Sequence, residues 1–463
     1  MKFTISQYKF ILFLFVFLLS VLLFSQTESK TKTTDDIEFS NFVSIVSSDN
    51  KQVHDKALLF LTENWKPEFE IIILEIFYFS QDFNLNQSLL KLIKAKTGKS
   101  YTLDVNKWYE DLWSKPQRIT PYYHKFKAQL HGLIDRRFTK YFYNRQNKAE
   151  IRLDEVRWGG VIQDGIPPLR DPQMISVNEA DYLEDNNIVF GIEINGDYRA
   201  YPKRILAWHE MFTDTVGGIP VAGVYCTLCG TVILYKTEHN GKTYNLGTSG
   251  FLYRSNKLMY DKETQSLWNT IWGKPVIGPL VNKGIELDYL SVVTTTWGEW
   301  KSRHPETTVL SLETGHKRNY GEGIAYKDYF SKDDVMFNVP NLDKNLKNKQ
   351  SILAIKLPEI TEKTIAISTD FLNKNTLYKN KLAEQNFVVL TDASGANRVY
   401  YSKDVEFASY DKKSSLVDKA GISWTLDENT LTSESGKTLK RLHSFNAFWF
   451  GWKAAHPNTK LIK

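Results

Sequence analysis

The second half of the sequence repeats itself, and this constrains the fold more than any other feature of the chain. The segment WGEWKSRHP at residues 297–305 recurs as WFGWKAAHP at residues 449–457, and a similar dipeptide follows each copy. A strand-turn-strand pattern at residues 224–235 recurs more weakly at residues 389–400. A repeat of this kind indicates that two copies of one folding unit lie in tandem.

The two cysteines of the chain stand three residues apart, and both belong to the first copy. At equal spacing, Cys226 corresponds to Thr391 and Cys229 corresponds to Ser394 in the second copy. A pair at C-x-x-C spacing can share one disulfide bond or one metal ion. Because the second copy does without the pair, the pattern favours a local chemical function over a crosslink that the unit needs for stability.

The sequence pattern changes near residue 150, from helix-like segments before it to strand-like segments after it, and this predicts an α+β protein. Apolar segments bounded by Pro67 and Gly98 predict paired short helices over residues 36–147, similar to an α-solenoid of the HEAT or armadillo kind. Later runs of β-branched and aromatic residues alternate with turn residues, which predicts mostly antiparallel strands. We expect an internally duplicated β-rich domain, with one copy at residues 155–320 and a cysteine-free copy at residues 340–463.

The cysteine turn lies between two predicted strands, residues 221–225 and 232–235. In thioredoxin-like enzymes a helix follows the first cysteine, and its dipole lowers the pKa of that thiol. The C-x-x-C-G turn instead resembles a zinc-ribbon knuckle, whose backbone N–H groups point at the sulfurs and stabilise thiolates. A structural zinc ion needs four protein ligands, so a metal at this pair would have to recruit histidines.

The N-terminal segment predicts export. Lys2 and Lys9 precede an apolar run at residues 10–24, and a polar stretch follows. This is the pattern of a signal peptide or signal anchor, which we place at residues 1–26. The remainder is then extracytoplasmic, in the periplasm or cell envelope, and contacts the membrane only through the N-terminal segment. In such a compartment an unprotected dithiol closes into a disulfide unless a metal or a reducing partner prevents it.

The net charge of +6 arises from 59 Lys and Arg residues spread among 53 Asp and Glu residues. Without a basic block or an aromatic-basic stripe, this composition argues against a nucleic-acid partner.

Two segments supply candidate partners for the cysteines. His209 lies in a short amphipathic segment before the cysteine turn, as a proton-transfer group, a metal ligand or an ordinary buried histidine. His304 and His456 recur in both copies, which favours packing and capping roles for them. The segment at residues 248–256 combines small hydroxyl residues with one arginine and suits a polar or anionic substrate. Its candidate substrate-binding residues are Ser249, Tyr253, Arg254 and Asn256.

Eight motifs of the chain follow one another in the order and spacing of the bacterial family called domain of unknown function 3179. They are DGIPP (164–168), RAYP (199–202), WHE (208–210), DTVGG (214–218), YCTLCGT (225–231), SGFLY (249–253), MYD (259–261) and TTWGEW (295–300). The chain resembles this family from about residue 155 to residue 462. The usual family motif has proline after the first cysteine, where this chain has Thr227. Some members are described as selenoproteins, and this implies redox chemistry at Cys226 or Cys229.

Three hypotheses follow. The first is an exported thiol-disulfide redox protein, a thiol oxidoreductase, in which Cys226 attacks a protein or small-molecule redox partner and Cys229 resolves the adduct, with assistance from His209. The second is a zinc- or copper-binding module that uses Cys226, Cys229 and His209. The third is a structural or interaction protein with one stabilising disulfide.

Overall fold

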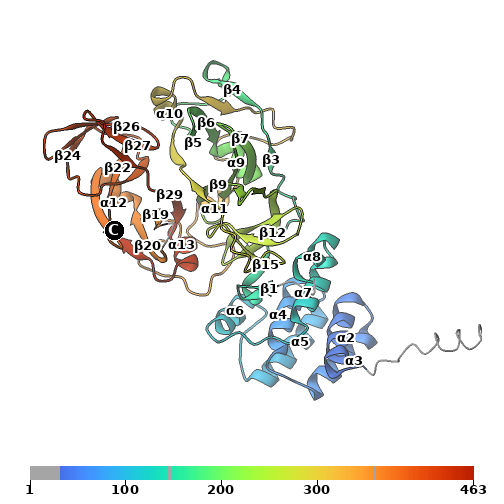
Figure 1. The fold of residues 1–463 in the computed structure, drawn as a ribbon. Helices are drawn as coiled ribbons and strands as arrows, with labels where there is room; N and C mark the ends of the chain where they lie inside the picture. Colours follow the sequence, from blue (N-terminus) through green and yellow to red (C-terminus); the bar gives the residue numbers. More distant parts are fainter. Residues whose placement is uncertain (1–31, 144–147, 358–359) are drawn as a thin grey trace, which may run out of the picture.

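The computed structural model describes residues 32–143, 148–357 and 360–463 (Figure 1). A helical region, drawn in blue, precedes a first β-rich unit in green and yellow and a second in orange and red. The predicted α+β class, with a helical region followed by mostly antiparallel sheets, is confirmed. The predicted signal segment at residues 1–26 lies outside the described residues.

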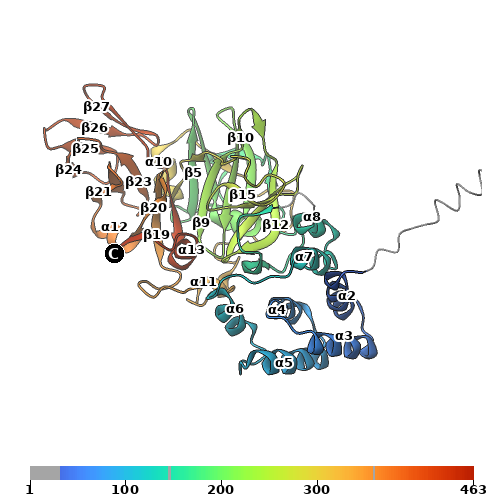
Figure 2. The ribbon, with the colours of Figure 1, turned by 60° about the horizontal axis from the view of Figure 1, so that its bottom comes forward.

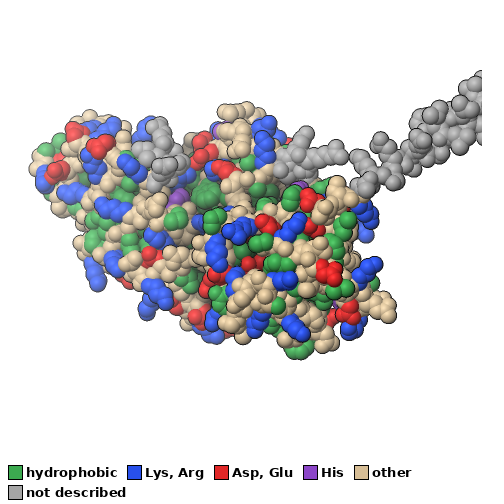
Figure 3. All heavy atoms as spheres, turned by 90° about the horizontal axis from the view of Figure 1, so that it is seen from below, with side chains coloured by type: hydrophobic (Ala, Val, Ile, Leu, Met, Phe, Trp, Pro, Cys, Tyr) green, Lys and Arg blue, Asp and Glu red, His purple; other side chains and the backbone are tan. Residues whose placement is uncertain are grey.

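The surface of the described part is mixed in charge. On the face seen in Figure 3, Lys and Arg side chains are interspersed with Asp and Glu side chains. Within the described residues, no helix combines the length and the apolar character that crossing a membrane requires.

Short helices joined by capped turns build the N-terminal region. The side chains of Asn50 and Asp82 accept hydrogen bonds from the first turns of two helices, and Gly98, at φ 71, ends the second of these helices as predicted. Residues 69–77 of α4 are all buried and form the centre of the core. The helices are α2 (Thr34–Ser47), α3 (Lys51–Glu63), α4 (Phe69–Phe79), α5 (Phe83–Thr97), α6 (Val105–Trp113), α7 (Tyr123–Gly132) and α8 (Thr139–Phe142).

The first β-rich unit is built from sheets with the strand orders β17-β5-β6-β18-β4, β16-β9-β8-β7-β3 and β1-β15-β14-β13-β12-β2. The second of these sheets carries the cysteine turn, and the third carries a hairpin that reaches it. The strands of the first sheet are β4 (Met174–Ser176), β5 (Ile188–Ile194), β6 (Asp197–Pro202), β17 (Val293–Thr296) and β18 (Thr308–Leu310). Those of the second are β3 (Leu169–Arg170), β7 (Met211–Val216), β8 (Ile219–Cys226), β9 (Thr231–Lys236) and β16 (Tyr289–Leu290). Those of the third are β1 (Lys148–Ala149), β2 (Val156–Trp158), β12 (Leu246–Tyr253), β13 (Asn256–Asp261), β14 (Leu267–Asn269) and β15 (Lys274–Gly278).

The second β-rich unit has the orders β29-β19-β20-β30, β21-β22-β23 and β24-β25-β26-β27-β28. Its first two sheets include β19 (Ser351–Leu357), β20 (Ile360–Ser368), β21 (Leu377–Leu382), β22 (Gln385–Thr391), β23 (Asn397–Tyr401), β29 (Ser444–Phe448) and β30 (Lys460–Ile462). Its third sheet has β24 (Phe407–Tyr410), β25 (Ser415–Asp418), β26 (Ser423–Leu426), β27 (Thr430–Ser433) and β28 (Thr438–Lys440). The helices that accompany the two units are α9 (Lys203–His209), α10 (Trp297–Arg303), α11 (Lys327–Phe330), α12 (Thr369–Lys374) and α13 (Trp449–Ala455).

The two units repeat one topology. β17-β5-β6-β18 matches β29-β19-β20-β30, and in both sheets the last pair of strands is parallel. The recurring sequence segments form α10 and α13. Trp300 donates its indole N–H to Thr307 Oγ1 at 2.9 Å, and Trp452 donates to Thr459 Oγ1 at 3.0 Å. The repeated sequence segment therefore forms the same kind of helix in both units, and in each the second tryptophan donates a hydrogen bond to a threonine that follows the helix.

Candidate active site at the cysteine turn

Two strands hold the cysteine turn, as the sequence predicts. β8 ends at Cys226 and β9 begins at Thr231, and these two residues are the last pair of the antiparallel ladder. Gly230 closes the turn at φ 60, a left-handed conformation that glycine adopts without strain. Because a strand follows the turn, a helix dipole does not supply the electrostatics of this site.

The two thiols are buried side by side. Cys226 is 2% exposed and Cys229 is fully buried, and both are free thiols in this structure. The Cys229 sulfur lies 3.1 Å from Thr231 Oγ1, and it accepts a hydrogen bond from Asn256 Nδ2 at 2.8 Å. The sulfur of Cys229 is thus surrounded by polar partners even though water does not reach it.

The surroundings shift the pKa values of the two thiols in opposite directions. Burial raises the pKa of Cys226, but hydrogen bonds from the Cys229 thiol and from the backbone N–H groups of Lys257 and Cys229 outweigh it, so that the pKa is lowered overall. Burial and the neighbouring Cys226 sulfur hold the pKa of Cys229 well above its usual range. Of the two thiols, Cys226 is therefore the one that loses its proton more readily.

A buried carboxylate lies beside the turn. Glu210 follows α9 in the left-handed conformation, at φ 55, and forms an ion pair with Lys257 in which Oε2 and Nζ are 2.7 Å apart. Its other oxygen, Oε1, accepts hydrogen bonds from the hydroxyls of Thr227 and Tyr326, each at 2.8 Å. Two hydroxyl donors and one ammonium group thus compensate the desolvation of this charge. Thr227, where the usual family motif has proline, contributes one of these hydrogen bonds.

The tip of the β12–β13 hairpin delivers two of these partners. β13 begins with Asn256 and Lys257, which reach Cys229 and Glu210 respectively. The two residues at the tip, Arg254 and Ser255, adopt positive φ values of 49° and 66°. Two-residue hairpin turns require this conformation, and residues other than glycine adopt it at a cost in strain. The strain is located where the hairpin meets the cysteines.

A pocket opens onto Cys226. Its volume is about 510 Å³, including the space at its open mouth. Cys226, Glu210 and Lys257 line it, whereas Cys229 is not among the lining residues and belongs with Cys226 to one buried cluster. The other lining residues are mostly apolar, namely Gly159, Val161, Ile166, Leu228, Thr248, Gly250, Phe251, Leu252, Tyr326, Met336 and Phe337. A ligand in this pocket would meet one thiol of the pair and one ion pair.

The second unit packs against the cysteine turn and contacts Cys229. β29, which leads into α13, packs against β9 (Figure 2), and the backbone N–H of Phe448 in β29 donates to the carbonyl of Cys229 at 2.7 Å. Gly451 of α13 packs so closely that a Cβ atom on it would lie 2.6 Å from Cys229 Cβ. Real Cβ atoms do not approach to this distance, so the fit of Cys229 depends on glycine at residue 451.

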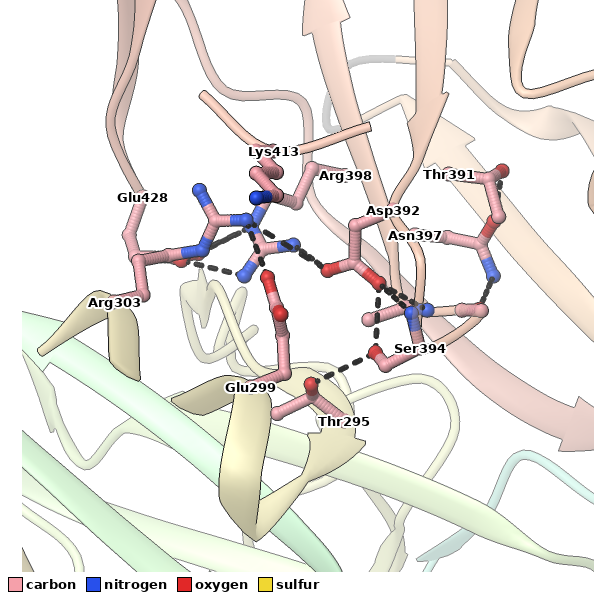
Figure 4. Close-up of polar contacts among 12 residues, drawn as sticks. Thr295, Glu299, Arg303, Thr391, Asp392, Ser394, Asn397, Arg398, Lys413 and Glu428 are labelled. Carbon is pink, nitrogen blue, oxygen red and sulfur yellow. Dashed lines mark hydrogen bonds and ion pairs between the residues drawn. The ribbon is translucent and has the colours of Figure 1, made fainter. Parts of the chain in front are cut away.

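The corresponding turn of the second unit makes the reciprocal contact with the first. Ser394, at the position that corresponds to Cys229, has its hydroxyl 3.1 Å from that of Thr295, which directly precedes the N-cap of α10 (Figure 4). Thr391, at the position of Cys226, donates to Asn397 Oδ1 at 2.7 Å. Each unit therefore presses this turn against the tryptophan helix of the other.

Buried charges replace the thiol pair in the second unit. Arg398, which is 1% exposed, donates to Asp392 at 2.7 Å and makes a two-point contact with Glu428 (Figure 4). His304 of the first unit lies 3.3 Å from Glu428, and Arg303 lies 3.9 Å from Asp392. Compensated charges of this kind serve packing between the units.

His209 lies near the turn in the chain, but its side chain points elsewhere. It is fully buried, its Nδ1 is 2.8 Å from the carbonyl of Pro167, and its Nε2 is 2.6 Å from the hydroxyl of Tyr320. Burial lowers its pKa to about 4, so the ring is neutral and accepts the tyrosine proton at Nε2. In the described residues, no three His, Cys, Asp or Glu side chains are grouped so as to hold a metal ion.

The structure separates the four predicted substrate-binding residues. Asn256 reaches Cys229, whereas Ser249 donates to the carbonyl of Leu258 at 2.6 Å and serves its own sheet. Arg254 forms an ion pair with Glu155 at 2.5 Å. It also donates to the carbonyl of Ala454 in α13 at 2.8 Å, so it fastens the hairpin to its neighbours on both sides.

Tyr253 is buried beside the aromatic ring of Trp272, with their ring centroids 5.9 Å apart. It therefore serves packing at the base of the same hairpin.

Sequence reasoning missed several groups of the site. Glu210 directly follows His209, and Lys257 directly follows Asn256, so each lies one residue from a residue that was singled out. Tyr326 comes from a distant segment that no local pattern marks, and Gly451 lies in the repeated segment at residues 449–457, where no letter indicates a contact with the cysteines. The WHE motif already contained Glu210, and it was the one signal that pointed to this carboxylate.

Comparison with known proteins finds a matching family model. The model of the family described as Protein of unknown function (DUF3179) matches residues 163–459, which include the cysteine turn, the hairpin and α13. No curated protein and no solved structure matches the chain.

Proposed function

The chain belongs to the DUF3179 family, which has no assigned reaction, and we propose that it is an exported thiol-disulfide redox protein. The observation that carries the proposal is the unequal pair of thiols: Cys226 lines the pocket and has the lowered pKa, whereas Cys229 does not line the pocket and has the raised pKa. These are the properties of an attacking thiol and a resolving thiol.

The first step is attack by the Cys226 thiolate on a disulfide or another two-electron oxidant. With a disulfide substrate, a bond forms between Cys226 Sγ and the nearer sulfur, the substrate S–S bond breaks, and the farther sulfur leaves as a thiolate. Once the adduct has formed, Cys226 no longer carries a negative charge. One cause of the raised pKa of Cys229 is thereby removed, so Cys229 loses its proton more readily after the first step.

In the second step the Cys229 thiolate attacks Cys226 Sγ, and the bound substrate sulfur leaves. Thr231 and Asn256, whose hydrogen bonds lower the pKa of Cys229, stabilise this thiolate. The protein ends as the Cys226–Cys229 disulfide and the substrate as two thiols. A partner dithiol of the exported compartment restores the reduced pair.

Trapping of the adduct tests this order of events. The Cys229→Ser variant, mixed with a disulfide reagent, is expected to accumulate a mixed disulfide at Cys226 that intact mass spectrometry detects. The Cys226→Ser variant is expected to form no adduct at the wild-type rate. Ser394→Ala, at the corresponding position of the second unit, serves as the matched control and is expected to behave as wild type. Wild-type behaviour in both cysteine variants would refute the proposal.

A further inference from the structure

We propose that the oxidant taken up at Cys226 is a small hydroperoxide with an apolar tail. This inference rests on the proposed function and names the substrate class of the same site. Three features of the site carry it: the burial of the Cys226 thiol, the apolar walls of the pocket and the Lys257 cation among its lining residues.

The pocket restricts what can reach the sulfur. Cys226 is reached through a pocket whose lining is mostly apolar. Cys226 is 2% exposed at the floor, so a folded partner cannot bring a disulfide to it without opening the site. A hydroperoxide needs only its terminal oxygen to reach the thiolate.

Apolar groups continue from the walls to the rim. The walls include Phe251, Leu252 and Phe337. Met336, which lines the pocket, is 54% exposed, and Ile162, which follows the lining residue Val161 in the chain, is 47% exposed. Exposed apolar groups at the rim of a pocket indicate a ligand with apolar surface to bury. This favours an alkyl or aryl hydroperoxide over hydrogen peroxide and over charged peptide disulfides.

The ion pair supplies the proton that the reaction requires. The Lys257 ammonium lines the pocket with Cys226, and Glu210 holds it at 2.7 Å. The Cys226 thiolate attacks the terminal oxygen of R–O–O–H, the O–O bond breaks, and the leaving alkoxide takes a proton from Lys257. The products are Cys226 sulfenic acid and the alcohol R–OH, and solvent reprotonates Lys257.

Cys229 then completes the reaction by forming the disulfide bond with Cys226. Its thiol condenses with the sulfenic acid, the S–S bond forms, and the sulfenic oxygen leaves as water with the thiol proton. The hydroperoxide has been reduced by two electrons, and the thiol pair has been oxidised by two electrons.

Stopped-flow kinetics with reduced protein test the substrate class. Cumene hydroperoxide is expected to oxidise Cys226 at least about tenfold faster than hydrogen peroxide, because burial of its apolar carbons adds binding energy. In the Cys229→Ser variant, dimedone is expected to trap the sulfenic acid at Cys226. Met336→Ser, at the exposed rim, should lower the rate with cumene hydroperoxide by a larger factor than the rate with hydrogen peroxide.

Lys257→Met tests the proton donor. The rate with hydroperoxide, divided by the rate of alkylation with iodoacetamide, is expected to fall about tenfold or more, because alkylation needs the thiolate but no proton donor. An unchanged ratio would exclude Lys257 as the donor. The iodoacetamide rate also reports whether the variant keeps its folded site.

The outcomes separate this inference from the proposed function. Equal rates with the two hydroperoxides, or no trapped sulfenic acid, would overturn the substrate class. If a disulfide reagent still closed the thiol pair reversibly, the proposed function would survive that result. If neither oxidant closed the pair, both proposals would fall.

Discussion

At the scale of single residues, the division of labour between Cys226 and Cys229 comes from their neighbours. Both are cysteines in one turn of six residues, and both are buried. Backbone N–H groups stabilise a negative charge on Cys226, whereas Cys229 relies on Thr231 and Asn256. A change at one of these neighbours is therefore expected to affect one step of the reaction and not the other.

Asn256→Leu removes the donor that lies 2.8 Å from the Cys229 sulfur at nearly constant volume. A hydrogen bond to a charged group contributes about 1.5–3 kcal/mol, so the Cys229 thiolate should become about 10- to 100-fold scarcer. We expect the mixed disulfide at Cys226 to form at the wild-type rate and to resolve more slowly, as followed by quenched mass spectrometry. Slower formation with normal resolution would reverse the assigned roles.

The roles of several single residues could not be predicted from the sequence. The roles of Arg254 and Ser249 followed from a segment rich in polar side chains, but in the fold both satisfy local partners. Composition predicts that a segment is polar, but it does not show which polar atoms remain free. His209 was singled out for its position in the chain, and the left-handed turn at Glu210 directs the carboxylate to the pocket instead.

At the scale of elements, the repeated helices could be predicted and their contacts could not. The repeated sequence segment predicted α10 and α13, and runs of β-branched residues predicted β8 and β9 on either side of the cysteines. A repeat shows that two units are alike, but it does not show that each places its helix on the turn of the other. This exchange follows from the tertiary packing of β29, β17 and their helices, which no local pattern encodes.

Gly451→Ala tests the contact of α13 with the cysteine turn. The added methyl group would lie 2.6 Å from Cys229 Cβ, and overpacking of this kind costs about 1–3 kcal/mol of unfolding free energy. Urea unfolding checks this value, and a thiol probe should report a changed rate of labelling at Cys226. Asn458→Ala, at an exposed position just after this helix, is the control and should change stability by less than about 0.5 kcal/mol. Equal stability of the two variants would contradict the close fit.

Arg398→Met tests the buried charges at the reciprocal contact. Without Arg398, Asp392 and Glu428 lose their closest cation, which is expected to cost about 3–5 kcal/mol of unfolding free energy. Lys413, an exposed neighbour shown in Figure 4, provides the control Lys413→Met, expected to be within about 0.5 kcal/mol of wild type. Chemical denaturation measures both, and a loss below about 1 kcal/mol for Arg398→Met would show that the charges are not coupled.

At the scale of the whole molecule, buried neutral histidines make stability depend on pH. Burial lowers the pKa of His209 and His443 to about 4 and that of His456 to about 3, against about 6.5 in an unfolded chain. At a pH between the folded and the unfolded pKa values, each of these histidines is protonated in the unfolded chain and neutral in the folded chain. The stabilisation is therefore complete above about pH 6.5 and is lost as the pH falls, by up to about 1.4 kcal/mol per pH unit for each histidine.

Urea unfolding at pH 7 and pH 5 checks this prediction. The wild type should be less stable at pH 5, and His456→Gln should lose less stability over the same interval because one titrating group is absent. A loss of equal size in both proteins would show that His456 is not held neutral by the fold.

The redox cycle is the central claim, and a thiol-disulfide titration of the intact protein tests it most directly. The protein is equilibrated over a series of dithiothreitol redox buffers, quenched by alkylation and weighed by mass spectrometry. We expect one reversible two-electron transition that converts Cys226 and Cys229 together, and that is absent from the Cys226→Ser and Cys229→Ser variants. Thiols that stay free, or a disulfide that persists, over the whole range of potentials would contradict the account.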